Sequence, residues 1–285
     1  MRMADVQLRI PFARIAAGTV LTLGVLPLLM PLVWMVSTSV KPEFDVFLNP
    51  PQLIPVRVRW QNYVDIFVQT AYARQYLNSI YIAALTVAGT VCVSAPAGYA
   101  LARLRFPGHA FVLPVLLSAL LLPNEILIVP QYAFMSQLGL IGTQVPVVLE
   151  GVFGAPAVIA TFLMRQFFLS LPKDLEDAGR VDGLGYFGVF FRIGLPLAGS
   201  ALATMALLTF LASWNAYLEP LVFTSGIRDL ITLPVALNSF TNIDGTPQYT
   251  LQMAATTLSI LPIAIVFLLA QRHIVEGIAR SGLKA

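Results

Sequence analysis

Apolar and charged residues alternate along the chain in long blocks. Six stretches of roughly 20 residues or more are nearly free of charge, and short polar segments separate them. A helix needs about 20 mainly apolar residues to cross the hydrocarbon core of a bilayer. We therefore predict an all-α integral membrane protein in which residues 1–285 form a single transmembrane domain. The six predicted spans are about 14–39, 77–102, 110–135, 145–165, 199–224 and 251–272.

Prolines interrupt the third block. This block carries Pro114, Pro123 and Pro130 together with the acidic Glu125. A proline inside a helix removes a backbone hydrogen bond and clashes with the preceding turn, so this span should kink or break. The segments at about 41–76 and 225–250 are predicted to be loops with short helical pieces, because proline, glycine and interfacial aromatic residues gather there.

The composition agrees with a membrane location. Apolar residues make up 58% of the chain and charged residues 11%, whereas about a quarter of a soluble domain is charged. The net charge is +3, but the basic residues stand at the ends of apolar blocks and form no stripe, so no nucleic-acid partner is predicted. The uncharged run from Ile15 to Val40 is longer than the core of a signal peptide, so we expect a retained first span rather than a cleaved leader. The lone Cys92 excludes an intrachain disulfide.

Lysine and arginine predict the orientation, because they gather on the cytoplasmic side of membrane proteins. With a cytoplasmic N-terminus, most of the 17 basic residues fall inside, and both termini and the stretch at 170–196 are cytoplasmic. Inside are Arg2, Arg9, Arg14, Arg103, Arg105, Arg165, Lys173, Arg180, Arg192, Arg272, Arg280 and Lys284; outside are Lys41, Arg57, Arg59, Arg74 and Arg228.

Catalytic motifs are weak or missing. Gly183, Gly185 and Gly188 match a dinucleotide-binding pattern, but a charged helical segment precedes them where that motif requires a strand. None of the lysines follows a glycine as in a phosphate loop, so the chain is not expected to hydrolyse ATP. His109 and His273 are isolated in the sequence, so no metal site and no catalytic residue are predicted.

Three acidic residues, Glu125, Glu150 and Glu219, lie within apolar blocks. A carboxylate at membrane depth is costly and usually faces a water-filled cavity or a partner. Glu150 lies near the outer end of its block, where it would reach the lipid headgroups. Glu125 and Glu219 lie deeper and are candidates for lining a substrate pathway.

An aromatic and polar run precedes Glu219. On a helix, Trp214, Asn215, Tyr217 and Glu219 would lie partly on one side. Rings beside amide and carboxylate groups suit a polyhydroxylated ligand. The alternative interpretation is a helix-packing cluster or an interfacial belt.

Charge concentrates in one stretch, Leu171 to Gly183. We predict a short amphipathic helix there, with Ser170 as its N-cap, Leu171 and Pro172 at its first positions and Gly183 at its end. Apolar side chains recur at a spacing of three to four residues along it, which predicts one apolar face. This face consists of Leu171, Leu175, Ala178 and Val181.

The same stretch resembles a known family, the permeases of ABC importers. Asp177-Ala-Gly-Arg-Val-Asp-Gly183, nine residues and then Ile193-Gly-Leu-Pro196 are similar to the EAA loop of that family. Asp177 stands where the family has Glu, and Gly179 where it has the second Ala. Further stretches resemble the maltose-type carbohydrate subfamily: Asn78-Ser79, Tyr99 to Gly108, Pro130-Gln-Tyr132, Arg165 to Phe168, Trp214-Asn215 and Pro220-Leu221.

The resemblance implies a function for the whole chain. It implies a permease that imports a carbohydrate by alternating access across the cytoplasmic membrane of a prokaryote. The implied partners are ABC ATPase subunits, which use ATP and Mg, a second homologous permease and an extracytoplasmic sugar-binding protein. The loop at 170–196 would be the coupling helix between spans four and five. The implied ATPase-coupling residues are Asp177, Ala178, Gly179, Asp182 and Gly183.

Two other functions are weighed against this one. An ion-coupled secondary transporter would use Glu125 or Glu219 as a proton relay, and would be expected to show inverted repeats. An integral-membrane enzyme would need a set of catalytic residues. The sequence shows neither feature, and it leaves the identity of the transported sugar open.

Overall fold

The computed structural model describes residues 4–238, 240 and 245–282 of the chain. This part is all-helical, as predicted, and it divides into two compact units. Of the described residues, 4–70, 240 and 245–258 form the first unit, and 71–238 and 259–282 form the second. Arg2 and Lys284, which contribute to the predicted orientation, lie outside the described residues.

Four helical segments among the described residues are long and apolar enough to cross a membrane. They are Ala17–Ser39 of α1 (Ala4–Ser39), α3 (Tyr72–Arg103), Val145–Ser170, and Tyr249–Arg272 of α14 (Tyr249–Gly282). Two bent helix pairs, 109–137 and 186–214, also have the length and composition of a span. The described chain therefore holds four to six candidate spans, which agrees with the prediction of a polytopic membrane protein.

The proline-rich third block is broken, as its sequence predicts. Helix α4 (His109–Ser118) continues as a 3₁₀ turn, η2 (Ala119–Leu121), and α5 (Asn124–Gln137) begins after Pro123. The two halves meet at an angle of 103°. Leu122 is extended because the ring of Pro123 excludes the helical conformation at the residue before it.

The fifth block, predicted to span 199–224, is not one continuous helix. Helix α11 (Gly199–Trp214) ends at Trp214, and α12 (Leu218–Phe223) begins after three non-helical residues. Pro220 accounts for the break, because in a continuous helix its ring would clash with the preceding turn. When the helix restarts at Leu218, Pro220 falls in the first turn, where a backbone N–H is not needed.

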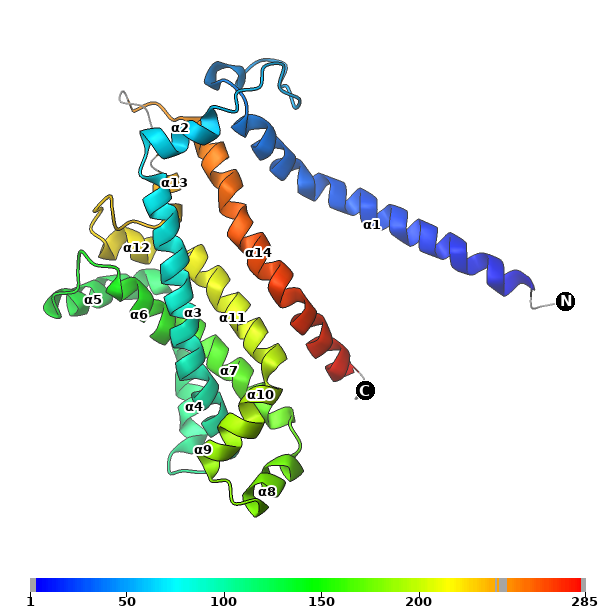
Figure 1. Ribbon diagram of the computed structural model, residues 1–285, viewed down its shortest axis with the longest axis vertical. Helices are drawn as coiled ribbons and strands as arrows, with labels where there is room; N and C mark the ends of the chain where they lie inside the picture. The colour runs from blue at the N-terminus through cyan, green and yellow to red at the C-terminus, as the bar shows by residue number, and fades with distance from the viewer. Residues whose placement is uncertain (1–3, 239, 241–244, 283–285) are drawn as a thin grey trace. The chain divides into compact units, whose positions relative to one another are not determined.

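Helix α3 is the centre of the second unit (Figure 1). It packs against α6 (Val145–Phe153), α7 (Ala155–Ser170) and α11. Gly98 permits a close approach of α3 to α7, because a Cβ there would lie 2.7 Å from the Cβ of Met164 and 2.9 Å from the backbone N of Arg165. A buried cluster of Tyr99, Phe168 and Phe190 closes the packing at this end of α3.

The other end of α3 holds α13 (Leu233–Leu237). The Asn78 amide donates to the backbone oxygens of Asp229 at 2.8 Å and Ile231 at 3.0 Å, and the Leu233 N–H donates to Ser79 Oγ at 2.7 Å. The pair Asn78-Ser79, noted in the sequence, therefore anchors the loop that precedes α13.

The first unit joins the C-terminal end of α1 to α2 (Asn62–Gln69). The buried Asn62 amide donates to the backbone oxygens of Ser39 and Lys41 at 2.9 and 2.8 Å. Glu43, in the 3₁₀ turn η1 (Glu43–Asp45), accepts hydrogen bonds from the N–H groups of Tyr249 and Thr250 at 2.8 and 3.0 Å. Its carboxylate thus satisfies free donors at the N-terminus of α14.

Candidate functional site

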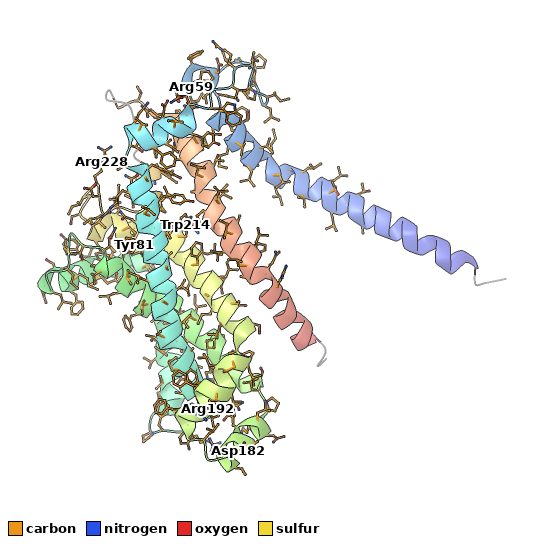
Figure 2. All side chains as sticks on the ribbon, viewed as in Figure 1. Arg59, Tyr81, Asp182, Arg192, Trp214 and Arg228 are labelled. Carbon is orange, nitrogen blue, oxygen red and sulfur yellow. The ribbon has the colours of Figure 1, made fainter. Side chains whose placement is uncertain are left out.

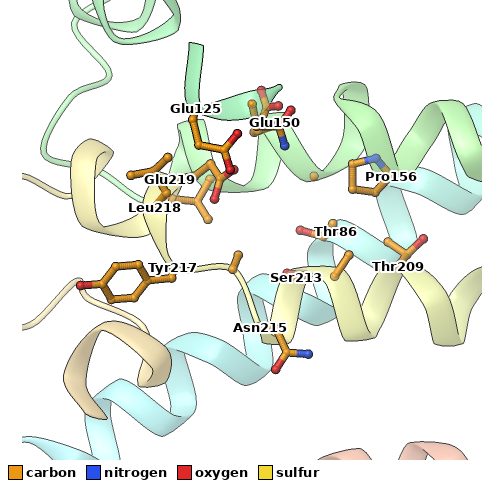
Figure 3. A pocket seen from close by; sticks show the side chains of 15 residues that line it. Thr86, Glu125, Glu150, Pro156, Thr209, Ser213, Asn215, Tyr217, Leu218 and Glu219 are labelled. Carbon is orange, nitrogen blue, oxygen red and sulfur yellow. The ribbon is translucent and has the colours of Figure 1, made fainter. Parts of the chain in front are cut away.

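A polar cavity of about 320 Å³ lies inside the second unit (Figure 3). Residues of α3, α5, α6, α7, α11, α12 and the break between α11 and α12 line it. Its lining includes three carboxylates, and those of Glu125, Glu150 and Glu219 gather at one side. Four of the five predicted pathway residues line this cavity: Glu125, Asn215, Tyr217 and Glu219.

The break after α11 brings Asn215, Tyr217 and Glu219 to the cavity. The prediction that these residues share one helix with Trp214 is wrong, because α11 ends at Trp214. Trp214 does not line the cavity; it is 3% exposed, stacks on Phe210 at 5.5 Å between ring centroids and meets Tyr76 edge-on at 5.9 Å. Trp214 therefore belongs to a helix-packing cluster, while the residues that follow it are free to face the cavity.

Glu150 also faces the cavity, which the sequence had not indicated for it. Gln131 Nε2 donates to its carboxylate at 3.1 Å. The carboxylate also lies against Gly154, where a Cβ would come within 2.4 Å of Glu150 Oε1. Gly154, the residue between α6 and α7, thus leaves the room in which the Glu150 side chain folds toward the cavity.

Thr86 of α3 is a cavity residue with no signal in the sequence. Its side chain is buried, and its hydroxyl has no hydrogen-bond partner among the described residues. A buried hydroxyl without a partner is unfavourable unless a ligand or water supplies one. Carboxylates, an amide and hydroxyls around one cavity can accept and donate hydrogen bonds to a hydroxyl-rich solute.

The charged stretch forms helix α8 (Lys173–Val181), at the end of the second unit where α3 terminates (Figure 1). Its predicted N-terminus is wrong. Ser170 is the last residue of α7 and its hydroxyl donates to Phe167 O at 2.7 Å, so it does not cap α8. Leu171 is extended because Pro172 follows it, and Pro172 is the N-cap.

Gly183 ends α8 as predicted. Its φ of +85° is a left-handed conformation that glycine adopts readily. The Leu184 N–H donates to Gly179 O at 2.9 Å and the Gly183 N–H to Arg180 O at 3.0 Å, which is a Schellman closure. Asp182, the residue directly before Gly183, lies at the exposed tip of this turn (Figure 2).

The face of α8 that packs on the protein differs from the predicted one. Leu175 is 42% exposed and Val181 88% exposed, whereas Glu176 and Gly179 are buried. A Cβ at Gly179 would lie 2.6 Å from Ile193 Cδ1, so glycine gives Ile193 its place against the helix. Asp177 and Ala178 lie on the exposed side.

An ion pair joins α8 to the end of α3. Arg103 Nε lies 2.6 Å from Glu176 Oε1, with the two side chains 5% and 10% exposed. A second guanidinium nitrogen of Arg103 donates to Leu171 O at 2.7 Å. Neither residue was predicted as part of the site, although Arg103 lies within the stretch Tyr99 to Gly108 that carries the family resemblance.

Comparison with known proteins agrees with this architecture. The family described as "Binding-protein-dependent transport system inner membrane component" matches residues 94–280. The arabinooligosaccharides transport system permease protein AraQ of Halalkalibacterium halodurans is 36% identical over 257 residues, covering 89% of this chain and 90% of the relative. The sn-glycerol-3-phosphate transport system permease protein UgpE of Yersinia pestis is 34% identical over 268 residues, covering 92% and 94%.

A solved structure shares the fold. A chain of a bacterial ABC transporter involved in the import of the acidic polysaccharide alginate superposes with a TM-score of 0.80 at 23% identity, covering 92% of this chain and 96% of that one. The sulfoquinovosyl glycerol transport system permease protein SmoH of Agrobacterium fabrum is 31% identical over 275 residues, covering 96% and 94%. From its sequence matches and its helical architecture, this chain belongs to the family of binding-protein-dependent transport system inner membrane components.

Proposed function

We propose that the chain is the membrane permease of an ATP-driven importer that moves a carbohydrate across the cytoplasmic membrane of a prokaryote. The family assignment and a relative named for arabinooligosaccharides support this function. The chain crosses the membrane six times with both termini in the cytoplasm, each bent helix pair counting as one span. The positive-inside distribution of lysine and arginine supports this orientation.

The observation that carries the proposal is the outer face of α8. The helix is held from one side by Glu176 and Gly179, and its other side exposes Asp177, Ala178 and the apolar Val181. Phe187, which follows the Gly183 turn, is 82% exposed. Apolar side chains beside carboxylates on an exposed helix are typical of a docking surface. In this proposal α8 is the coupling helix, and Asp177, Ala178, Gly179, Asp182 and Gly183 form or shape the contact with the ATPase subunit.

The transported solute passes through the cavity lined by Glu125, Asn215, Tyr217 and Glu219. ATP-driven closure of two ATPase subunits displaces α8, and the membrane helices alternate between inward-facing and outward-facing states. The chain needs only to be bistable, because its partners bias the equilibrium through their different affinities for the two states.

Two further partners complete the importer. An extracytoplasmic binding protein delivers the carbohydrate, as the family description implies. A second, homologous permease pairs with this chain and closes the pathway from the other side. ATP and Mg are bound by the ATPase subunits, and this chain is not itself an enzyme.

The function can be tested on the native complex. The affinity-tagged chain is purified from its own membrane, and we expect an ATPase with a phosphate-loop motif and a second permease to co-purify. In proteoliposomes that hold this complex and the binding protein, import of radiolabelled oligosaccharide requires ATP and continues when a protonophore abolishes the proton gradient.

The same assay addresses the ion-coupled alternative, in which Glu125 or Glu219 would relay protons. The family assignment disfavours proton coupling, because the proposed importer of this family is driven by ATP. Uptake that stops with the protonophore while ATP remains, or a complex without an ATPase, would refute the proposed function.

A further inference from the structure

The cavity of the second unit carries acidic groups that no described basic side chain neutralises. Glu125, Glu150 and Glu219 come from α5, α6 and α12, and among the described residues no lysine or arginine lines the cavity with them. The ion pairs found among the described residues lie elsewhere, at Arg57–Asp45, Arg59–Asp65 and Arg103–Glu176. The electrostatic potential inside the cavity is therefore negative.

The carboxylate of Glu150 is held in place by its surroundings. Gln131 fixes the carboxylate of Glu150 by a hydrogen bond of 3.1 Å, and Gly154 leaves the space into which this carboxylate folds. Glu219 lies in the first turn of α12, next to Pro220. A carboxylate that is prearranged as Glu150 is interacts with a solute without first having to reorganise.

A second, independent observation points to a bound solute. Thr86 lines the cavity with its residue 1% exposed, and its buried hydroxyl has no partner in the described part of the chain. A hydroxyl of this kind can both donate and accept a hydrogen bond. A solute that carries hydroxyl groups would supply the missing partner, and its other hydroxyls could donate to the carboxylates.

We infer that this cavity selects by charge: it passes uncharged, hydroxyl-rich saccharides and rejects saccharides that carry a carboxylate, phosphate or sulfonate. The inference rests on the proposed carbohydrate function and adds the substrate class to it. The cavity volume of about 320 Å³ lies at the lower end of the range of about 300 to 1,000 Å³ for small-molecule pockets. An anion in so small a space lies close to all three carboxylates and has no cation to pair with. An uncharged sugar meets no such repulsion.

The charge effect is large enough to measure. Even at a separation of roughly 12 Å, wider than the cavity itself, two like charges repel at an effective dielectric constant of about 20 strongly enough to change an equilibrium constant by about tenfold. Removing one carboxylate charge should therefore relax the discrimination against an anionic sugar by about this factor. Charge removal far from the cavity should leave the discrimination unchanged.

The test uses the complete importer in proteoliposomes with its binding protein. The probes are arabinotriose, maltotriose and cellotriose, each paired with the aldonate made by oxidising its reducing end. Uptake of each pair is measured for the wild type and for Glu125→Gln, Glu150→Gln and Glu219→Gln. Asp229→Asn is the control, since Asp229 is exposed and does not line the cavity. The binding protein is the same throughout, so a changed ratio between the variants originates in this chain.

We expect the wild type to import the neutral member at least about a hundredfold faster, and each cavity variant to narrow this ratio about tenfold. Asp229→Asn should keep the wild-type ratio. Equal import of a sugar and its aldonate by the wild type would overturn the inference, as would cavity variants with an unchanged ratio or a control that narrows it equally. Import of none of the six probes would instead contradict the proposed carbohydrate function itself.

Discussion

The ion pair between Arg103 and Glu176 offers the sharpest test of how α8 is attached to the membrane helices. The pair is almost fully buried, with the side chains 5% and 10% exposed, and it joins the last helical residue of α3 to the inner face of α8. Replacing Glu176 with glutamine leaves the Arg103 guanidinium buried without its counter-charge. We expect α8 to detach from α3 more often in this variant.

The size of the effect follows from burial. Removing one partner of a buried ion pair costs about 3 to 5 kcal/mol, because the remaining charge stays uncompensated. A double replacement with apolar residues, Arg103→Met with Glu176→Leu, removes both charges and should recover most of this loss. The free energy that holds α8 against α3 should remain about 1 kcal/mol smaller in the double variant than in the wild type, because the hydrogen bond of 2.7 Å from Arg103 to Leu171 O is also lost.

Hydrogen–deuterium exchange of residues 173–184 measures the detachment directly. A loss of about 3 kcal/mol in local stability accelerates amide exchange roughly a hundredfold. The Glu176→Gln importer should also hydrolyse ATP with less transport per ATP. Asp174→Asn is the matched control, because Asp174 lies on the exposed side of the same helix.

A double-mutant cycle of Arg103→Met, Glu176→Leu and their combination decides whether the pair acts as a unit. If Glu176→Gln changes the amide exchange rate by less than about fivefold, or if the stability losses of Arg103→Met and Glu176→Leu simply add in the double variant, then Arg103 and Glu176 do not hold α8 as the structure indicates. If the double variant has the amide exchange rates and the transport per ATP of the wild type, the pair acts as the structure indicates.

Two glycines give further tests. Gly183→Val places a β-branched residue at φ +85°, so it should destabilise the end of α8 by about 2 kcal/mol and abolish co-purification of the ATPase. Asparagine tolerates this conformation, so the Gly183→Asn variant should still co-purify with the ATPase. Normal transport by the valine variant would contradict the docking role of α8. Gly98→Ala brings a methyl group within 2.9 Å of the Arg165 backbone and should lower the stability of the α3–α7 pair by about 1 to 3 kcal/mol in thermal unfolding. The control is Gly24→Ala inside α1, which meets no atom within 4 Å and should not lower the stability, because alanine favours the helix more than glycine does. Equal melting temperatures for the two variants would show that α3 and α7 are not in close contact at Gly98.

The sequence alone predicts the class of the protein and where its apolar segments lie, because transfer into a bilayer depends on the local run of side chains. It also predicts the break at Pro123 and the closing turn at Gly183, since both depend on the backbone restrictions of single residues. The same restriction at Pro220 could have indicated that the fifth block ends at Trp214, but the continuous hydropathy of the block concealed it.

The face of α8 could not be predicted from its own sequence. Its apolar residues recur at helical spacing, which usually identifies the buried side. In the folded chain the buried side holds Glu176 and Gly179 instead, because Arg103 and Ile193 supply a counter-charge and a complementary surface. Both of these partners lie on other elements, so only the tertiary structure shows which side of α8 is free to dock.

The cavity shows the same division. The sequence by itself identified Glu125 and Glu219 as candidates for a pathway, because a carboxylate within an apolar block needs a polar environment. The tertiary structure shows that Glu150 and Thr86 also line the cavity and that Trp214 packs between helices instead. It also shows that carboxylates from three helices lie together at one side of the cavity. The physical reason is that the transfer free energy of a residue is a local property, whereas the groups it meets depend on helix packing between distant parts of the chain.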